Sequence, residues 1–147
     1  MVEEDKLGSL RNEIDAIDDK LLELLNRRAS ITKSVGDVKR EAGGRVEYYR
    51  PDREAEVLSR LKNANEGPLT DKTVVGLMRE IISVCLSLEK VLRVAYLGPE
   101  GTYTHAALKE RFGSAVESVS CEDIPEVFKL VEADRSDYGV VPIENSS

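Results

Sequence analysis

The charged residues whose spacing could support chemistry start with Arg28, which interrupts an otherwise apolar heptad repeat. Lys39 follows after almost three whole helical turns, so both cations would face one side of a single helix, about 16 Å apart. Two cations arranged in this way could bind an anionic ligand that carries separated negative groups. The alternative is that Arg28 sets the register of a helix pair or extends its guanidinium group into solvent.

Two further charged residues could join this pair. Arg11 precedes Arg28 by a spacing that rotates its side chain about 100° away on the same helix. Arg11 could therefore reach the Arg28 pocket from an antiparallel partner helix, or it could lie on a solvated face. Glu89 ends an apolar line in a third helix, one turn after Cys85, where a carboxylate is either a surface terminus or a pocket residue.

The helix that would carry these cations is predicted by apolar residues that recur in alternating steps of three and four from Leu7 to Val38. A helix of about 35 residues would be roughly 50 Å long, too long for a small domain to bury within itself. We therefore expect a partner chain, and a symmetric homodimer is the usual arrangement. Gly43 and Gly44 are expected to end the helix.

Two shorter helices would complete an all-α segment. Pro51 begins the first of them, and Gly67-Pro68 stops it. Thr70 is expected to cap the next, which runs from Asp71 to about Leu92. Its predicted inner stripe consists of five apolar residues: Val74, Leu77, Ile81, Val84 and Leu88.

From Arg93 onward the pattern changes to short strands that alternate with helices. VAYL, AVESVSC and YGVVPI are predicted strands, separated by the predicted helices HAALKERF and EDIPEVFKLVEA. This β-α-β-α-β order indicates a parallel sheet. Three parallel strands would leave an open edge, so residues 93–147 are interpreted as the incomplete beginning of a second domain.

Composition argues against several classes of partner. The net charge of −7 argues against nucleic acid, and no apolar run approaches the roughly 18 residues of a membrane helix. The polar, acidic start lacks the features of a secretory signal, so a cytoplasmic location is expected. Cys85 and Cys121 have neither metal-ligand nor redox spacing, which predicts two buried thiols and no metal or cofactor.

Three stretches, LRNEIDAIDDKLLELLNRRASITKSVGDVK, RPDREAEVL and MREIISVCLSLEKVL, resemble the all-helical class of chorismate mutases. VAYLGPEGTYTHAAL and YGVVPIENSS resemble the opening of prephenate dehydratase. Together they look like the bifunctional P-protein family, with a mutase domain over residues 1–92 and a truncated dehydratase domain over residues 93–147. The resemblance implies an intertwined three-helix homodimer, followed by an α/β fragment of a periplasmic-binding-protein-like domain.

The resemblance also implies an activity, the rearrangement of chorismate to prephenate in phenylalanine and tyrosine biosynthesis, without a cofactor. Arg28, together with Arg11 of the partner subunit, would pair with the two substrate carboxylates, because a guanidinium group matches a carboxylate bidentately. Lys39 would contact the ether oxygen and meet the negative charge that develops there.

Other residues would complete the pocket by the same resemblance. Arg53 and Glu54 would lie on its second-helix side, where Glu54 would hold the ring hydroxyl, and Cys85 and Glu89 would come from the third helix. Many relatives have a small hydroxyl residue in place of Cys85 and a glutamine in place of Glu89. To donate to the ether oxygen, Glu89 would have to be protonated, because an ionised carboxylate only accepts hydrogen bonds.

The motifs GPEGT and PIENSS resemble segments that line a prephenate cleft, through Thr102, Asn145 and Ser146. The Thr-Arg-Asp motif that the dehydratase family uses lies beyond this sequence, so we expect neither dehydratase activity nor feedback inhibition. His105 is expected to cap or pack the helix that follows GPEGT. One alternative is a non-enzymatic helical dimerisation module, and another is a dehydratase-type enzyme whose helical segment only regulates it. A third is a mutase that binds its ligand but turns it over slowly.

Overall fold

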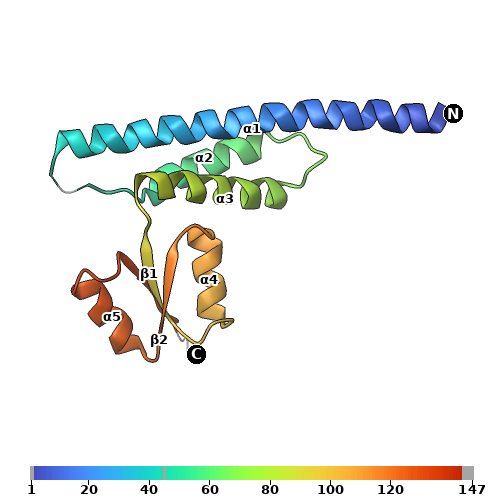
Figure 1. Cartoon of the computed structure of the whole chain (residues 1–147). Helices are drawn as coiled ribbons and strands as arrows, with labels where there is room; N and C mark the ends of the chain where they lie inside the picture. The colour runs from blue at the N-terminus through green and yellow to red at the C-terminus, as the bar shows by residue number, and fades with distance from the viewer. Residues whose placement is uncertain (1, 45, 144–147) are drawn as a thin grey trace.

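The computed structural model describes residues 2–44 and 46–143, beginning with three helices. These are α1 (Val2–Ala42), α2 (Pro51–Ala64) and α3 (Asp71–Glu89), as the sequence pattern predicts. α1 lies alongside α3 only over its C-terminal half, and its N-terminal half extends past both shorter helices (Figure 1). None of the described helices combines the length and the apolar character of a membrane span.

The ends of the helices follow local sequence signals. Gly43 adopts a φ of 71°, which glycine tolerates at the end of α1. Pro51 occupies the first turn of α2, where its missing N–H is not needed. The Thr70 side chain caps α3 by accepting a hydrogen bond from the backbone nitrogen of Thr73 at 3.2 Å.

The predicted inner stripe of α3 is wrong within this chain. Leu77, Val84 and Leu88 are about half exposed, whereas Ser83 and Cys85 are the buried residues of the helix. Ile82 and Leu86 instead line a cavity beside Cys85, because α3 packs against α1, α2 and α4 and therefore has no single inner face.

Residues after α3 form the predicted β-α-β-α-β unit. Its elements are β1 (Arg93–Leu97), α4 (Tyr103–Phe112), β2 (Glu117–Cys121), α5 (Ile124–Glu132) and β3 (Tyr138–Val140). The three strands form a parallel sheet in the order β2-β1-β3. This α/β unit lies on the side of α3 away from α1 (Figure 1).

Alternating residues of the central strand build the two small cores of the α/β unit. Val94 and Tyr96 pack with Leu108 of α4 on one face of the sheet. Ala95 packs with Cys121 and with Val127 of α5 on the opposite face. The sheet is therefore covered by one helix on each face, which explains why Val94, Ala95 and Tyr96 of β1 are all buried.

The α/β unit contacts α3 through the segment after α4. The Ser83 hydroxyl donates to the carbonyl oxygen of Phe112 at 2.6 Å, and the Glu80 carboxylate accepts from the backbone nitrogen of Ser114 at 3.1 Å. Gly113 adopts a φ of +73°, and a Cβ there would stand 2.6 Å from Ser83 Cβ. Glycine is thus required at this point, both for its conformation and for the close approach.

Candidate active site

A cavity of about 270 Å³ lies between α1, α2, α3 and the loop that joins the first two helices. Four cationic side chains and two carboxylates line it, so the cavity is positively charged although the chain as a whole is acidic. The charged lining residues are Arg28, Lys39, Arg50, Arg53, Glu54 and Glu89, and the others are Thr32, Val35, Tyr48, Tyr49, Val57, Ile82, Cys85 and Leu86.

Lys39 of α1 and Glu89 of α3 meet inside this cavity. Lys39 Nζ lies 3.3 Å from Glu89 Oε1, with 27% of the lysine side chain and 7% of the glutamate side chain exposed. The two atoms are close enough for an ion pair, but Oε1 is buried without a properly aligned hydrogen-bond donor. That oxygen therefore retains the capacity to accept from, or when protonated to donate to, a bound molecule.

Gly36 allows the close approach of α1 and α3 at this pair. It is the buried residue of α1, and a Cβ at this position would lie 3.1 Å from Glu89 Cγ. Glycine inside a helix costs roughly 1 kcal/mol relative to alanine, and here that cost is offset by the contact that it permits. The glycine thus brings Glu89 to the Lys39 side of α1.

Glu54 of α2 is the second carboxylate in the cavity, and its side chain is 11% exposed. Its Oε1 atom lies 3.6 Å from Arg79 Nη1. Burial raises the pKa of Glu54 above its usual value, and the positive charges of Arg79 and Arg111 partly oppose that rise. The neighbouring arginines therefore stabilise the ionised form of Glu54 against the effect of its burial.

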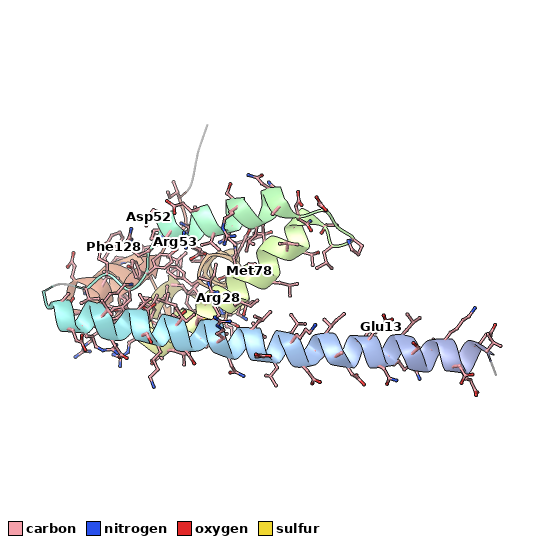
Figure 2. The ribbon with its side chains drawn as sticks, turned by 90° about the horizontal axis from the view of Figure 1, so that it is seen from above. Glu13, Arg28, Asp52, Arg53, Met78 and Phe128 are labelled. Atoms are coloured by element: carbon pink, nitrogen blue, oxygen red, sulfur yellow. The ribbon has the colours of Figure 1, made fainter. Side chains whose placement is uncertain are left out.

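Two arginines of the cavity, Arg28 and Arg53, differ in their solvent exposure. Arg28 is partly buried on the side of α1 that faces α3, with Met78 of α3 nearby in Figure 2. Arg53 is 64% exposed and forms a rim ion pair of 3.4 Å with Glu56, a contact of small energetic value. Arg28 is thus the less exposed of these two arginines.

Residues 10–90, more than half of the chain, match the family Chorismate mutase type II. This chain belongs to the chorismate mutase type II family. Residues 94–147 match the family Prephenate dehydratase. A solved chorismate mutase (Form II) from Thermus thermophilus is 34% identical, with a TM-score of 0.55, covering 58% of this chain and 94% of that chain.

Longer proteins also match. A bifunctional chorismate mutase/prephenate dehydratase of Pseudomonas aeruginosa is 49% identical over 100% of this chain and 41% of the relative. A protein of the same name from Aquifex aeolicus is 44% identical over 97% of this chain and 40% of its own length. The chain thus spans about two fifths of the length of the curated relatives that it matches.

In this chorismate mutase family member, six of the seven predicted mutase residues line one cavity. Arg11 is the exception, because it lies on the exposed N-terminal half of α1, about 25 Å along the helix from Arg28. Glu13, which is labelled in Figure 2, lies on the same part of α1, where the helix extends past α2 and α3. Arg11 cannot reach the cavity of its own chain.

The loop that joins α1 to α2 contributes two tyrosines to the cavity lining, for which the sequence predicts no role. Tyr48 lies between Lys39 and Lys90, whose ammonium groups are 5.8 and 5.9 Å from its ring centroid. Tyr49 is 8% exposed, and its burial raises the pKa of its hydroxyl. Both tyrosines lie in a short loop between the predicted pocket residues Lys39 and Arg53, and this position could have indicated from the sequence that they line the cavity.

The predicted prephenate residues are described only in part. The Thr102 hydroxyl caps α4 by accepting from the His105 backbone nitrogen at 3.4 Å, and it lies 3.4 Å from the Leu97 carbonyl oxygen. Asn145 and Ser146 lie outside the described residues. His105 is buried, stacks on Tyr96 at 4.8 Å and accepts from the backbone nitrogen of Gly101, which confirms its predicted packing role.

Proposed function

We propose that this chain is a chorismate mutase, which rearranges chorismate to prephenate. The observation that supports this most strongly is the cavity, where Arg28, Lys39 and Glu89 converge with Glu54 and Cys85 from separate helices. A cationic cavity of this kind suits a dicarboxylate that must fold onto itself. The family membership and the name of the Thermus thermophilus relative favour the same reaction.

The reaction breaks a C–O bond and makes a C–C bond within one molecule, so the protein has to hold a compact conformer and stabilise moving charge. Arg28 would bind one carboxylate bidentately, and Lys39 would face the ether oxygen as negative charge develops on it. An acceleration of about 10⁶ corresponds to about 8 kcal/mol, which a few preorganised charged contacts can supply.

The carboxylates of the cavity would have different tasks. Ionised Glu54 would accept a hydrogen bond from the ring hydroxyl, and protonated Glu89 would donate to the ether oxygen beside Lys39. Cys85 would pack against the substrate as a small apolar group, because a thiol is only a weak hydrogen-bond donor. Arg53 would close the opening of the cavity.

We further propose that the active form is a symmetric homodimer in which Arg11 of the partner subunit completes the cavity. The heptad residues of the N-terminal half of α1 are between 49% and 59% exposed, and they form one continuous stripe: Leu7, Leu10, Ile14, Ile17, Leu21 and Leu24. An apolar stripe of this length is suited to pairing with a second copy of the same helix. An antiparallel partner would bring its own Arg11 toward Arg28.

For residues 93–147 we propose a segment of a dehydratase domain of periplasmic-binding-protein type, in line with the family match of residues 94–147. The domain boundary near residue 92 and a cytoplasmic location also remain proposals. The boundary is supported by the change from heptads to alternating strands and helices at Arg93.

Chromatographic separation of the reaction mixture, followed by mass spectrometry of each separated compound, tests the proposed reaction directly, because an isomer with the mass of chorismate is recognised by its different retention time. A mutase converts chorismate into an isomer of identical mass, whereas a dehydratase acting on prephenate releases water and carbon dioxide. We expect the isomer alone. Recovery of unchanged chorismate after incubation with folded protein would instead favour a helical dimerisation module.

A further inference from the structure

Arg79 of α3 connects the cavity to the α/β unit, although it does not line the cavity itself. Its Nη1 atom lies 3.6 Å from Glu54 Oε1 and donates to the carbonyl oxygen of Glu110 at 3.3 Å. One guanidinium nitrogen therefore joins a carboxylate of the cavity to the last turn of α4. The Arg79 side chain is only 26% exposed, so its position is restricted.

Tyr49 makes a second connection on the same side. Its ring lines the cavity and also packs against Phe112 of α4, with ring centroids 4.9 Å apart, and against Tyr138 of β3 at 5.2 Å. Two cavity residues from different segments are thus connected to the same end of the α/β unit, Glu54 through Arg79 and Tyr49 directly.

This end of the α/β unit is held firmly against α3. Ser83 donates to the Phe112 carbonyl oxygen, and Gly113 approaches Ser83 so closely that no Cβ fits between them. The Glu80 carboxylate binds both the backbone nitrogen and the hydroxyl of Ser114. Residues 110–114 therefore give Arg79 and Tyr49 a fixed support.

We infer that the α/β unit is a structural part of the mutase site, and that Arg79 is a positioning residue that holds Glu54 ionised and oriented toward the ring hydroxyl. The inference rests on the proposed mutase function. It assigns residues 93–143 a structural role in the mutase reaction, and this role does not depend on any dehydratase chemistry.

The pH dependence of kcat/KM tests this role. The groups that face Glu54 are Arg79 of α3, Arg111 of α4 and Tyr49 of the joining loop. Because burial raises the pKa of Glu54 and the arginines oppose the rise, loss of Arg79 should let Glu54 protonate at higher pH. A required carboxylate gives activity above its pKa, so the acid limb of the profile should move upward.

Arg79→Met should lower kcat/KM about 10-fold near pH 6 and less than about 3-fold near pH 8. Arg79→Lys retains the charge and should leave the acid limb close to that of the wild type. Arg111→Met, an exposed change on the α/β unit, should move the limb in the same direction by a smaller amount. Lys129→Met removes an exposed cation of α5, a helix without contacts to α3 among the described residues, and should leave the profile unchanged.

The outcomes separate the inference from the function on which it rests. An active wild type whose pH profile is reproduced by both Arg79→Met and Arg111→Met would overturn the inference and leave the mutase assignment intact. A wild type without turnover would overturn both. If Arg79→Met fails to fold in a thermal melt, the profile of Arg111→Met decides between the outcomes.

Discussion

Lys39 and Glu89 place opposite charges 3.3 Å apart within the cavity, one at the C-terminal end of α1 and the other at the end of α3. The glutamate is almost fully buried, and its Oε1 atom has no aligned hydrogen-bond donor. A substrate ether oxygen placed beside both groups could receive a hydrogen bond from Lys39, and a second one from Glu89 only when that carboxyl group is protonated. The protonation of one carboxyl group would then determine how strongly the site stabilises the transition state.

Glu89→Gln should change the pH dependence of the reaction. If protonated Glu89 donates to the ether oxygen, wild-type kcat/KM should have an alkaline limb that falls with rising pH, in addition to the acid limb that belongs to Glu54. The glutamine amide donates at every pH, so the variant should lose this alkaline fall. Steady-state rates across the pH range provide the measurement, with the exposed rim change Glu56→Gln as control. Identical profiles for Glu89→Gln and wild type would show that Glu89 does not donate.

Gly36→Ala should impair activity more than stability. The new methyl group would stand 3.1 Å from Glu89 Cγ, so the carboxylate must shift by a few tenths of an ångström. Alanine adds roughly 1 kcal/mol of helix propensity, which offsets the lost packing. We expect a similar Tm and a fall in kcat/KM of about 5-fold.

Gly76→Ala provides the matched control for that change. Gly76 lies inside α3, and a Cβ there would meet nothing within 4 Å. This variant should gain stability and retain its activity. A Gly36→Ala variant with wild-type activity would show that the close approach of α1 and α3 does not set the position of Glu89.

Complementation between two inactive variants should show which subunit supplies Arg11 to each cavity. In a mixed dimer of Arg11→Ala and Arg28→Ala chains, one cavity would contain Arg28 and the partner's Arg11, and the other cavity would contain neither. Random pairing at equal amounts should then restore about a quarter of the wild-type sites. The measurement is the specific activity of co-expressed chains carrying different tags. Activity no higher than the mean of the two separate variants would exclude a shared site.

Asp137→Asn should destabilise the attachment of the α/β unit. The Asp137 carboxylate accepts from Lys90 Nζ and from the Arg93 backbone nitrogen, each at 2.8 Å. Burial raises the pKa of Asp137, but these donors outweigh it and hold the net pKa below 3.8. A depressed pKa adds stability that is present above this value and is lost as the pH falls through the folded-state pKa.

Denaturant unfolding should show a loss of about 2 kcal/mol in Asp137→Asn at neutral pH, and the difference from wild type should shrink as the pH falls below the ordinary pKa of an aspartate towards the lowered pKa of Asp137. Glu117→Gln is the control, since Glu117 pairs with Arg93 at an exposed surface and should contribute little. A pH-independent difference would contradict the role of the Asp137 charge.

The sequence predicted most of the elements and most of the cavity. The heptad pattern and the Thr70 cap have local physical causes, so α1 and the start of α3 could be located without tertiary information. The pocket residues came from the resemblance, but the spacing of Arg28 and Lys39 independently indicated one face of one helix. The structure brings both to the same cavity.

The parts that were missed depend on contacts between distant segments. The stripe predicted for α3 assumed a single buried face, yet α3 contacts three other helices and exposes Leu77, Val84 and Leu88. From sequence alone, Gly36 is only a cost to helix stability, whereas the structure places Glu89 directly against it. The link from Arg79 to Glu110 crosses between the helical segment and the α/β unit, which no periodic pattern could reveal.

The most direct test is the loss of chorismate absorbance with wild-type protein and with Arg28→Ala, between about pH 5 and 9. We predict turnover by the wild type and a fall of about 100-fold or more in the variant, because Arg28 anchors a substrate carboxylate in a partly buried cavity. A folded, dimeric wild type without turnover, or an Arg28→Ala variant with undiminished activity, would contradict the proposed function.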